Sequence, residues 1–249
     1  MSVLMAGSRL VHYEAAGRGQ PVILLHGWLG SWRYWWPTMQ ALATHARAFA
    51  FDLYGFGGSS KSADAYSLES YVEQLDDFVA ELGLSLPLSL VGHALGAAVA
   101  LHFAGRQPRA VARLALVGLP SHGRHFDPRS ANGRSLAHSD RYQSVSVELH
   151  KNDAAAVSKL AGQLAGHSFA ADFDQLACPT LLIYGRDDPA GRWPLAAADG
   201  PCQRVELPGC GQFPMLEQPA VFNRLLQEFI RTDLSSPLAP KVYWQRRTR

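Results

Sequence analysis

The sequence predicts an α/β fold: a doubly wound, mostly parallel sheet with a small helical cap inserted between two late strands. Short apolar segments alternate with amphipathic ones over most of the chain, which is typical of strands joined by helical crossovers. Most of the apolar segments are apolar throughout, as expected for strands covered on both faces. Residues 120–176 interrupt this alternation and contain no clear strand, so we expect them to form the cap.

The individual elements follow from hydrophobic period and flanking residues. We expect strands at 8–16, 21–27, 46–53, 88–93, 113–119, 180–185 and 203–208. Helices are expected at 68–82, 95–106 and 219–232. Ser67 is suited to cap the first helix, and Pro219 is suited to begin the last.

These elements divide the chain into three parts. Residues 1–119 and 177–232 form the sheet domain, and 120–176 form the cap, with helical stretches around 140–150 and 152–166. Residues 233–249 form a tail with four basic side chains, which we expect to be a loosely docked terminus.

Composition excludes several classes of protein. The 249 residues are 47% hydrophobic and 18% charged, with a formal charge of +2, so we expect a globular protein without a nucleic-acid partner. No apolar run approaches the roughly 20 residues that span a bilayer, and the N-terminus does not resemble a signal peptide. The three cysteines lack metal-site spacing and are expected to be free thiols in the cytoplasm. Nothing indicates an oligomeric state.

Five motifs follow predicted strands, at the edge where such sheets bind ligands. They are His26-Gly27-Trp28, the glycine-rich turn 52–59, the Gly-His-Ala-Leu-Gly run at 92–96, the Tyr-Gly-Arg-Asp-Asp-Pro run at 184–189, and the loop 208–214. Together these motifs resemble the α/β-hydrolase superfamily, in particular its capped members of esterase, C–C hydrolase and haloperoxidase type. The resemblance covers nearly the whole chain.

The resemblance implies a catalytic triad, which this chain lacks in two positions. The family's nucleophile elbow is Gly-x-Ser-x-Gly, and the serine position is occupied by Ala94. The spacing from Gly185 places the acid at Asp188. The histidine position after the last strand is occupied by Gln212, whose amide cannot take up a proton near neutral pH.

The resemblance also implies an oxyanion hole made of backbone N–H groups, which these replacements leave intact. Its donors would be Trp28 and Leu95, the latter at a helix N-terminus. Five further residues are expected to contact the ligand: His26, Gly27, His93, Trp32 and Phe213. For His93 and His26 the alternative interpretation is a buried structural histidine.

Two kinds of function remain open. One is a non-hydrolytic protein that binds a small apolar carbonyl compound, or a noncovalent catalyst of isomerase, lyase or cyclase type. The alternative is an esterase-like serine hydrolase inactivated at positions 94 and 212. We expect no cofactor and no metal, because His122 and His125 have no acidic or cysteine partner at useful spacing.

Overall fold

The computed structural model describes residues 2–125, 142–173, 175–188, 202–231 and 238–239. It contains one sheet with the strand order β1-β2-β4-β3-β5-β6-β7-β8. The strands are β1 (Ser2–Ala6), β2 (Arg9–Gly17), β3 (Pro21–Leu25), β4 (Arg47–Phe51), β5 (Leu88–His93), β6 (Val111–Val117), β7 (Thr180–Gly185) and β8 (Cys202–Leu207). β2 pairs antiparallel with both β1 and β4, and the remaining neighbours are parallel. The expected doubly wound, mostly parallel sheet is therefore confirmed.

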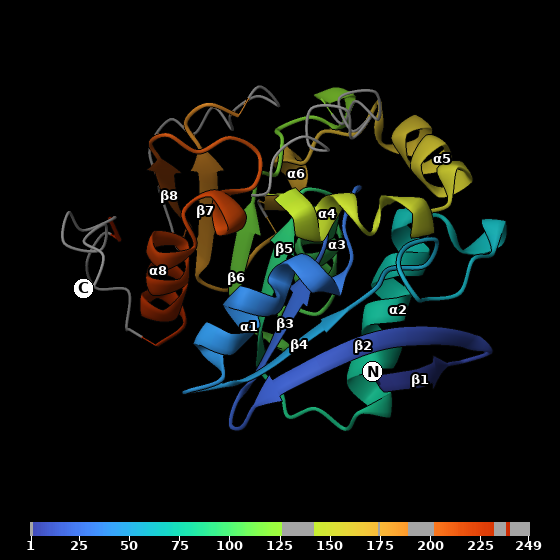
Figure 1. Cartoon of the computed structure of the whole chain (residues 1–249), viewed down its shortest axis with the longest axis horizontal. Helices are drawn as coiled ribbons and strands as arrows, with labels where there is room; N and C mark the ends of the chain where they lie inside the picture. Colours follow the sequence, from blue (N-terminus) through green and yellow to red (C-terminus); the bar gives the residue numbers. More distant parts are fainter. Residues whose placement is uncertain (1, 126–141, 174, 189–201, 232–237, 240–249) are drawn as a thin grey trace.

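Burial explains why the central strands read as continuous apolar runs. Every residue of β3, β5 and β7 is buried. Four helices cover the sheet: α1 (Trp36–Leu42) packs on α8 (Pro219–Arg231), and α2 (Leu68–Glu81) packs on α3 (Leu95–Arg106). The two pairs lie on opposite faces of the sheet (Figure 1). The carboxyl ends of the parallel strands are left for loops and for the cap.

Short helices connect β6 to β7. They are η3 (Gly123–His125), α4 (Gln143–Ser146), η5 (Leu149–Lys151), α5 (Ala154–Leu164) and α6 (Ala170–Phe173). In Figure 1, α4, α5 and α6 lie on the side of the sheet toward which the arrowheads of β6, β7 and β8 point. The stretch expected to be helical over 140–150 is broken into α4 and η5, with Val147 exposed between them.

Two differences from the expected elements concern the N-terminal half. β1 was not expected, and it forms a hairpin with β2 through Gly7, which has a φ of 57°. α1 was not expected either, and it follows the 3-10 helix η1 (Trp32–Trp35) directly. The tail expected at 233–249 lies almost entirely outside the described residues. Among the helices that the structure describes, none is long and apolar enough to cross a membrane.

Candidate active site

The chain makes a strained turn at Ala94, between β5 and α3. Ala94 has φ 48° and ψ −107°, and within the described residues it is the one non-glycine residue with a positive φ. Its N–H donates to the Val117 carbonyl at 2.9 Å, and the residue is 3% exposed. Such a conformation costs on the order of 1–3 kcal/mol and is found mainly at functional sites. Ala94 thus has the backbone conformation of a nucleophile elbow, although its side chain is only a methyl group.

The glycines on either side of the elbow are required by close backbone contacts. A Cβ atom on Gly92 would lie 2.3 Å from the Gly96 carbonyl oxygen, and one on Gly96 would lie 2.4 Å from the Leu25 carbonyl oxygen. The start of α3 is therefore pressed against the end of β3. Leu95 is the first residue of α3, where N–H groups have no intrahelical acceptor and the helix dipole favours negative charge.

The turn after β3 lies directly beside the elbow. A Cβ atom on Gly27 would lie 3.2 Å from Cβ of Ala94 and 2.9 Å from Nδ1 of His93. The Gly27 N–H donates to the Tyr34 hydroxyl at 2.6 Å, which fixes the path of the backbone into Trp28. The backbone segments that carry the two expected oxyanion donors, Trp28 and Leu95, therefore lie beside each other.

His26 fastens this turn to the one after β4. Its Nε2 accepts from the Leu53 N–H at 2.9 Å, so its Nδ1 carries the proton and donates to the Gly27 carbonyl at 2.8 Å. Burial lowers the pKa of His26, although the Asp52 carboxylate acts in the opposite direction. Both ring nitrogens have protein partners, so the contacts are those of the structural interpretation. Direct ligand contact stays a prediction.

His93 is held in the same way beneath the elbow. Its Nε2 lies 2.9 Å from the Gln212 carbonyl oxygen, which can only accept, so the Nε2 is protonated. Its Nδ1 accepts from the Tyr34 hydroxyl at 2.9 Å. Burial lowers the pKa of His93 to about 4, so the ring is neutral at pH 7. These contacts favour a positioning role, and the expected ligand contact stays a prediction.

Tyr34 belongs to an aromatic-rich segment of the sequence, but the sequence analysis did not assign this residue to the site. Its hydroxyl links the Gly27 N–H to His93, and burial raises its pKa well above the usual value. The result is one buried chain of hydrogen bonds from the turn after β3, through Tyr34 and His93, to the loop after β8. No local spacing marks this residue, because the bond joins segments far apart in the sequence.

Asp188 and Gln212 reach the same edge from β7 and β8. A Cβ atom on Gly118 would lie 3.6 Å from the carboxylate of Asp188 and 3.8 Å from the Nε2 of His93. Both side chains therefore approach the backbone of Gly118. The loop holding Gln212 is fixed by Glu217, whose carboxylate accepts the N–H of Gly211 at 2.5 Å. Ala94, Asp188 and Gln212 therefore follow β5, β7 and β8 at the same edge of the sheet, and a side-chain contact between Asp188 and Gln212 stays a prediction.

Aromatic rings flank this edge from the cap and from η1. The Phe213 ring lies 4.9 Å from that of His93 and 5.6 Å from that of Tyr142, a cap residue that the sequence analysis did not single out. Trp32 differs, because its ring contacts are with His12 and Trp36, each at 6.1 Å between centroids. Phe213 thus lies between elbow and cap, while a role for Trp32 in ligand contact stays a prediction.

Asp52 organises the glycine-rich turn after β4. Its buried carboxylate accepts from the N–H groups of Trp32 and Gly58 and from Nδ1 of His12, each at 2.8 Å. Three donors on one carboxylate compensate for its removal from water. This side chain therefore ties β2, η1 and the turn together behind the site.

The sheet order, the strained turn between β5 and α3, and the convergence of loops after β3, β5, β7 and β8 define a hydrolase-type α/β protein. The chain belongs to the alpha/beta hydrolase fold family, which it matches over residues 20–144.

Relatives share both sequence and fold with this chain. It is 26% identical to the 2-hydroxy-6-oxo-6-(2'-aminophenyl)hexa-2,4-dienoic acid hydrolase of Metapseudomonas resinovorans, over 94% of this chain and 92% of the relative. It is 28% identical to the 2-hydroxy-6-oxo-2,4-heptadienoate hydrolase of Pseudomonas putida, over 93% and 96%. A solved esterase from Exiguobacterium antarcticum superposes with a TM-score of 0.79 at 17% identity, over 90% and 96%, which shows the fold.

Proposed function

We propose that this chain binds a small, mostly apolar carbonyl compound without forming a covalent bond to it. The carbonyl oxygen lies at the backbone N–H groups of Leu95 and Trp28, and any turnover is of isomerase, lyase or cyclase type. The observation that carries the proposal is Ala94, a buried methyl group in the strained elbow conformation. The geometry of a nucleophile turn is thus combined with a residue that cannot attack.

The two replacements remove serine-type hydrolysis. Acyl transfer by this route needs an oxygen nucleophile and a base that takes its proton. In a well-studied serine protease, loss of either group costs roughly 10⁶ in turnover. Ala94 has no oxygen, and the Gln212 amide is no base at neutral pH. We therefore expect no efficient ester hydrolysis.

The groups that bind an oxyanion do not depend on either side chain. They are backbone donors, and the Leu95 donor is supported by a helix of twelve residues. One such donor contributes about 3–4 kcal/mol when negative charge develops on the bound oxygen. Ala94 also presents a methyl group where a serine would present a hydroxyl, which favours an apolar ligand over water.

The relatives suggest a class of ligand. Two relatives that match nearly full length are named as hydrolases of 2-hydroxy-6-oxo dienoic acids. Such a compound carries a ketone conjugated to a dienol. Conversion of the dienol to its keto form moves one proton from oxygen to carbon and needs no nucleophile. An oxyanion hole stabilises the dienolate between the two forms, and the Asp188 carboxylate is the nearby group suited to carry the proton.

Binding is tested by calorimetry with 6-oxoheptanoate, which keeps the ketone and the carboxylate but has no dienol. The matched ligand is heptanoate, which lacks only the ketone. We expect saturable binding of 6-oxoheptanoate that is weakened by tenfold or more, about 1.4 kcal/mol, in heptanoate. Equal affinity for the two ligands would show that no carbonyl is recognised.

Turnover is tested with 2-hydroxy-6-oxohepta-2,4-dienoate. The expected result is loss of the dienol absorbance faster than in buffer, with no release of acetate detected by NMR. Stoichiometric acetate means that the carbon–carbon bond is hydrolysed, and this outcome would contradict the proposal.

The alternative is an esterase-like hydrolase that lacks only its nucleophile and base. It is favoured by the intact elbow glycines and by the fixed loop around Gln212. The double variant Ala94→Ser with Gln212→His restores both groups. Saturable hydrolysis of p-nitrophenyl acetate by the double variant, and by neither single variant, supports this alternative. An inactive, folded double variant supports the non-hydrolytic proposal.

A further inference from the structure

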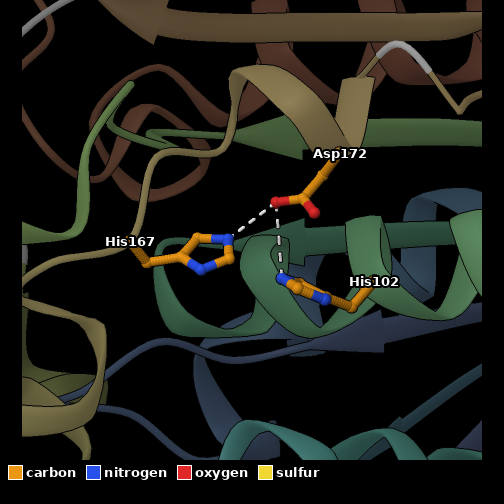
Figure 2. A group of neighbouring side chains, drawn as sticks. All are labelled: His102, His167 and Asp172. Atoms are coloured by element: carbon orange, nitrogen blue, oxygen red, sulfur yellow. Dashed lines mark hydrogen bonds and ion pairs between the residues drawn. The ribbon is translucent and has the colours of Figure 1, made fainter.

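Two histidines and an aspartate converge outside the elbow, where the cap meets α3. His102 comes from α3, Asp172 from α6, and His167 from the turn before α6 (Figure 2). Oδ2 of Asp172 lies 2.8 Å from Nε2 of His167 and 3.5 Å from Nε2 of His102. One ligand-type atom from each residue lies within 4.8 Å of the other two. Figure 2 shows both rings directed at the same carboxylate oxygen.

Packing holds the three side chains in this arrangement. The buried Phe169 ring contacts the His167 ring at 4.7 Å and the His102 ring at 6.4 Å between centroids. The side chains of His102, His167 and Asp172 are 23%, 32% and 19% exposed. The cluster is thus partly desolvated but still reachable from solvent, as a site for a dissolved ion must be.

One atom of the cluster is left unsatisfied. Within the part of the chain that the structure describes, the buried Nε2 of His102 makes no hydrogen bond, although it lies 3.5 Å from Oδ2 of Asp172. A buried polar atom in that condition costs on the order of 1–3 kcal/mol. A cation between the rings would bind both this nitrogen and the Asp172 oxygen. The hydrogen bond from His167 to Asp172 leaves the His102 nitrogen without a hydrogen bond of its own.

The surrounding charges are compatible with a cation. Asp172 and Glu69 act on His102 as negative charges, whereas Arg106 acts as a positive one.

We propose that His102, His167 and Asp172 bind one zinc ion or a similar divalent transition metal, with water completing the coordination. Tetrahedral zinc takes nitrogen and oxygen ligands at about 2.0–2.2 Å, which places the ligand atoms about 3.4 Å apart. The observed separations bracket that value, so small side-chain rotations suffice. Two imidazoles select zinc, nickel or copper over magnesium and calcium.

The expected absence of a metal site is revised here, and the ligands differ from the two cap histidines weighed from the sequence. The ion would join α6 of the cap to α3, the helix whose first residue is Leu95. The proposed role of the site is therefore to link the cap to the sheet domain, away from the elbow. This inference is independent of the proposed carbonyl ligand.

The test is zinc titration of the full chain, read by a chromophoric competitor and by metal analysis after gel filtration. We expect one zinc per chain and a rise in melting temperature that EDTA reverses. His102→Gln, His167→Gln and Asp172→Asn should each weaken zinc binding at least about tenfold. The matched control is His150→Gln, an exposed histidine of η5, which should bind zinc like the parent.

A second measurement separates lost ligands from lost folding. Cobalt(II) substituted for zinc should give the visible absorption of a tetrahedral site in the parent and in His150→Gln, but not in folded ligand variants. No zinc bound at micromolar concentration, or ligand variants that bind zinc like the parent, would overturn the proposal. Those results would mean that the cluster is only a hydrogen-bonded His–Asp group.

Discussion

Replacement of Ala94 by glycine tests whether the elbow is truly strained. Glycine adopts a positive φ without the clash that a Cβ atom causes, so Ala94→Gly should release strain of about 1–3 kcal/mol. Two effects oppose this gain. Glycine increases the entropy of the unfolded chain by about 0.4–1 kcal/mol, and the lost buried methyl costs about 0.8 kcal/mol. We expect the free energy of unfolding to rise by about 0.5 kcal/mol.

Ala100→Gly is the matched control, because Ala100 is buried in the middle of α3 with no positive φ. There the same change loses helix propensity of about 1 kcal/mol and a buried methyl of about 0.8 kcal/mol. The two variants should therefore differ by about 2 kcal/mol in the free energy of unfolding, or roughly 4–8 °C in melting temperature.

The assay is urea unfolding followed by circular dichroism, with thermal melts as a check. Ala94→Gly should unfold at a urea concentration equal to or above that of the parent, and Ala100→Gly clearly below it. If Ala94→Gly loses as much stability as Ala100→Gly, then Ala94 is not held in a strained conformation. The argument that the chain maintains an elbow against a conformational cost would then fail.

Three further variants test the network behind the elbow. His93 has a folded pKa of about 4, below its ordinary 6.5, so the unfolded chain takes up a proton first as the pH falls. Stability from this effect is complete above pH 6.5 and is lost toward pH 4 by about 1.4 kcal/mol per pH unit. In urea unfolding, the free energy of unfolding of His93→Gln should therefore depend less steeply on pH than that of the parent. An unchanged pH dependence would contradict a buried neutral His93. Asp52→Asn should cost about 3–5 kcal/mol in urea unfolding, because an amide cannot accept from three donors. The exposed Asp76→Asn should stay within about 0.5 kcal/mol of the parent, and equal effects would refute the role given to Asp52. Glu217→Ala should raise amide hydrogen exchange at Gly211 and Phe213, because the Glu217 carboxylate accepts both N–H groups. Unchanged exchange would show that the loop is held otherwise.

The central elements of the fold could be predicted because their signals are local. β3, β5 and β7 are short apolar runs. The residue before α2 is Ser67, and its side chain accepts the Ser70 N–H as expected of a helix N-cap. β1 was missed because an edge strand of five residues is defined by its partner, here β2, more than by its own pattern. α1 was missed because its aromatic-rich surroundings have weak helix propensity.

The candidate site also contains residues that the sequence marks locally and residues that only the three-dimensional contacts reveal. Motif residues such as Gly27, Ala94 and Asp188 could be proposed from the sequence because each follows a strand at a recognisable spacing, and their contact with a ligand stays a prediction. Tyr34 and Tyr142 were not found, because they join the site through contacts between distant segments. The metal-type cluster was missed for the same reason, since its three residues come from three separate parts of the chain.

The central claim is that a ligand carbonyl is bound by backbone donors at the elbow. It is tested most directly by titrating 6-oxoheptanoate into ¹⁵N-labelled protein and following the amide resonances of Leu95 and Trp28. Leu68, the first residue of α2, is an internal control because it too begins a helix. We predict saturable shifts at Leu95 and Trp28 with little change at Leu68. Binding that leaves the Leu95 and Trp28 resonances unmoved would contradict the account.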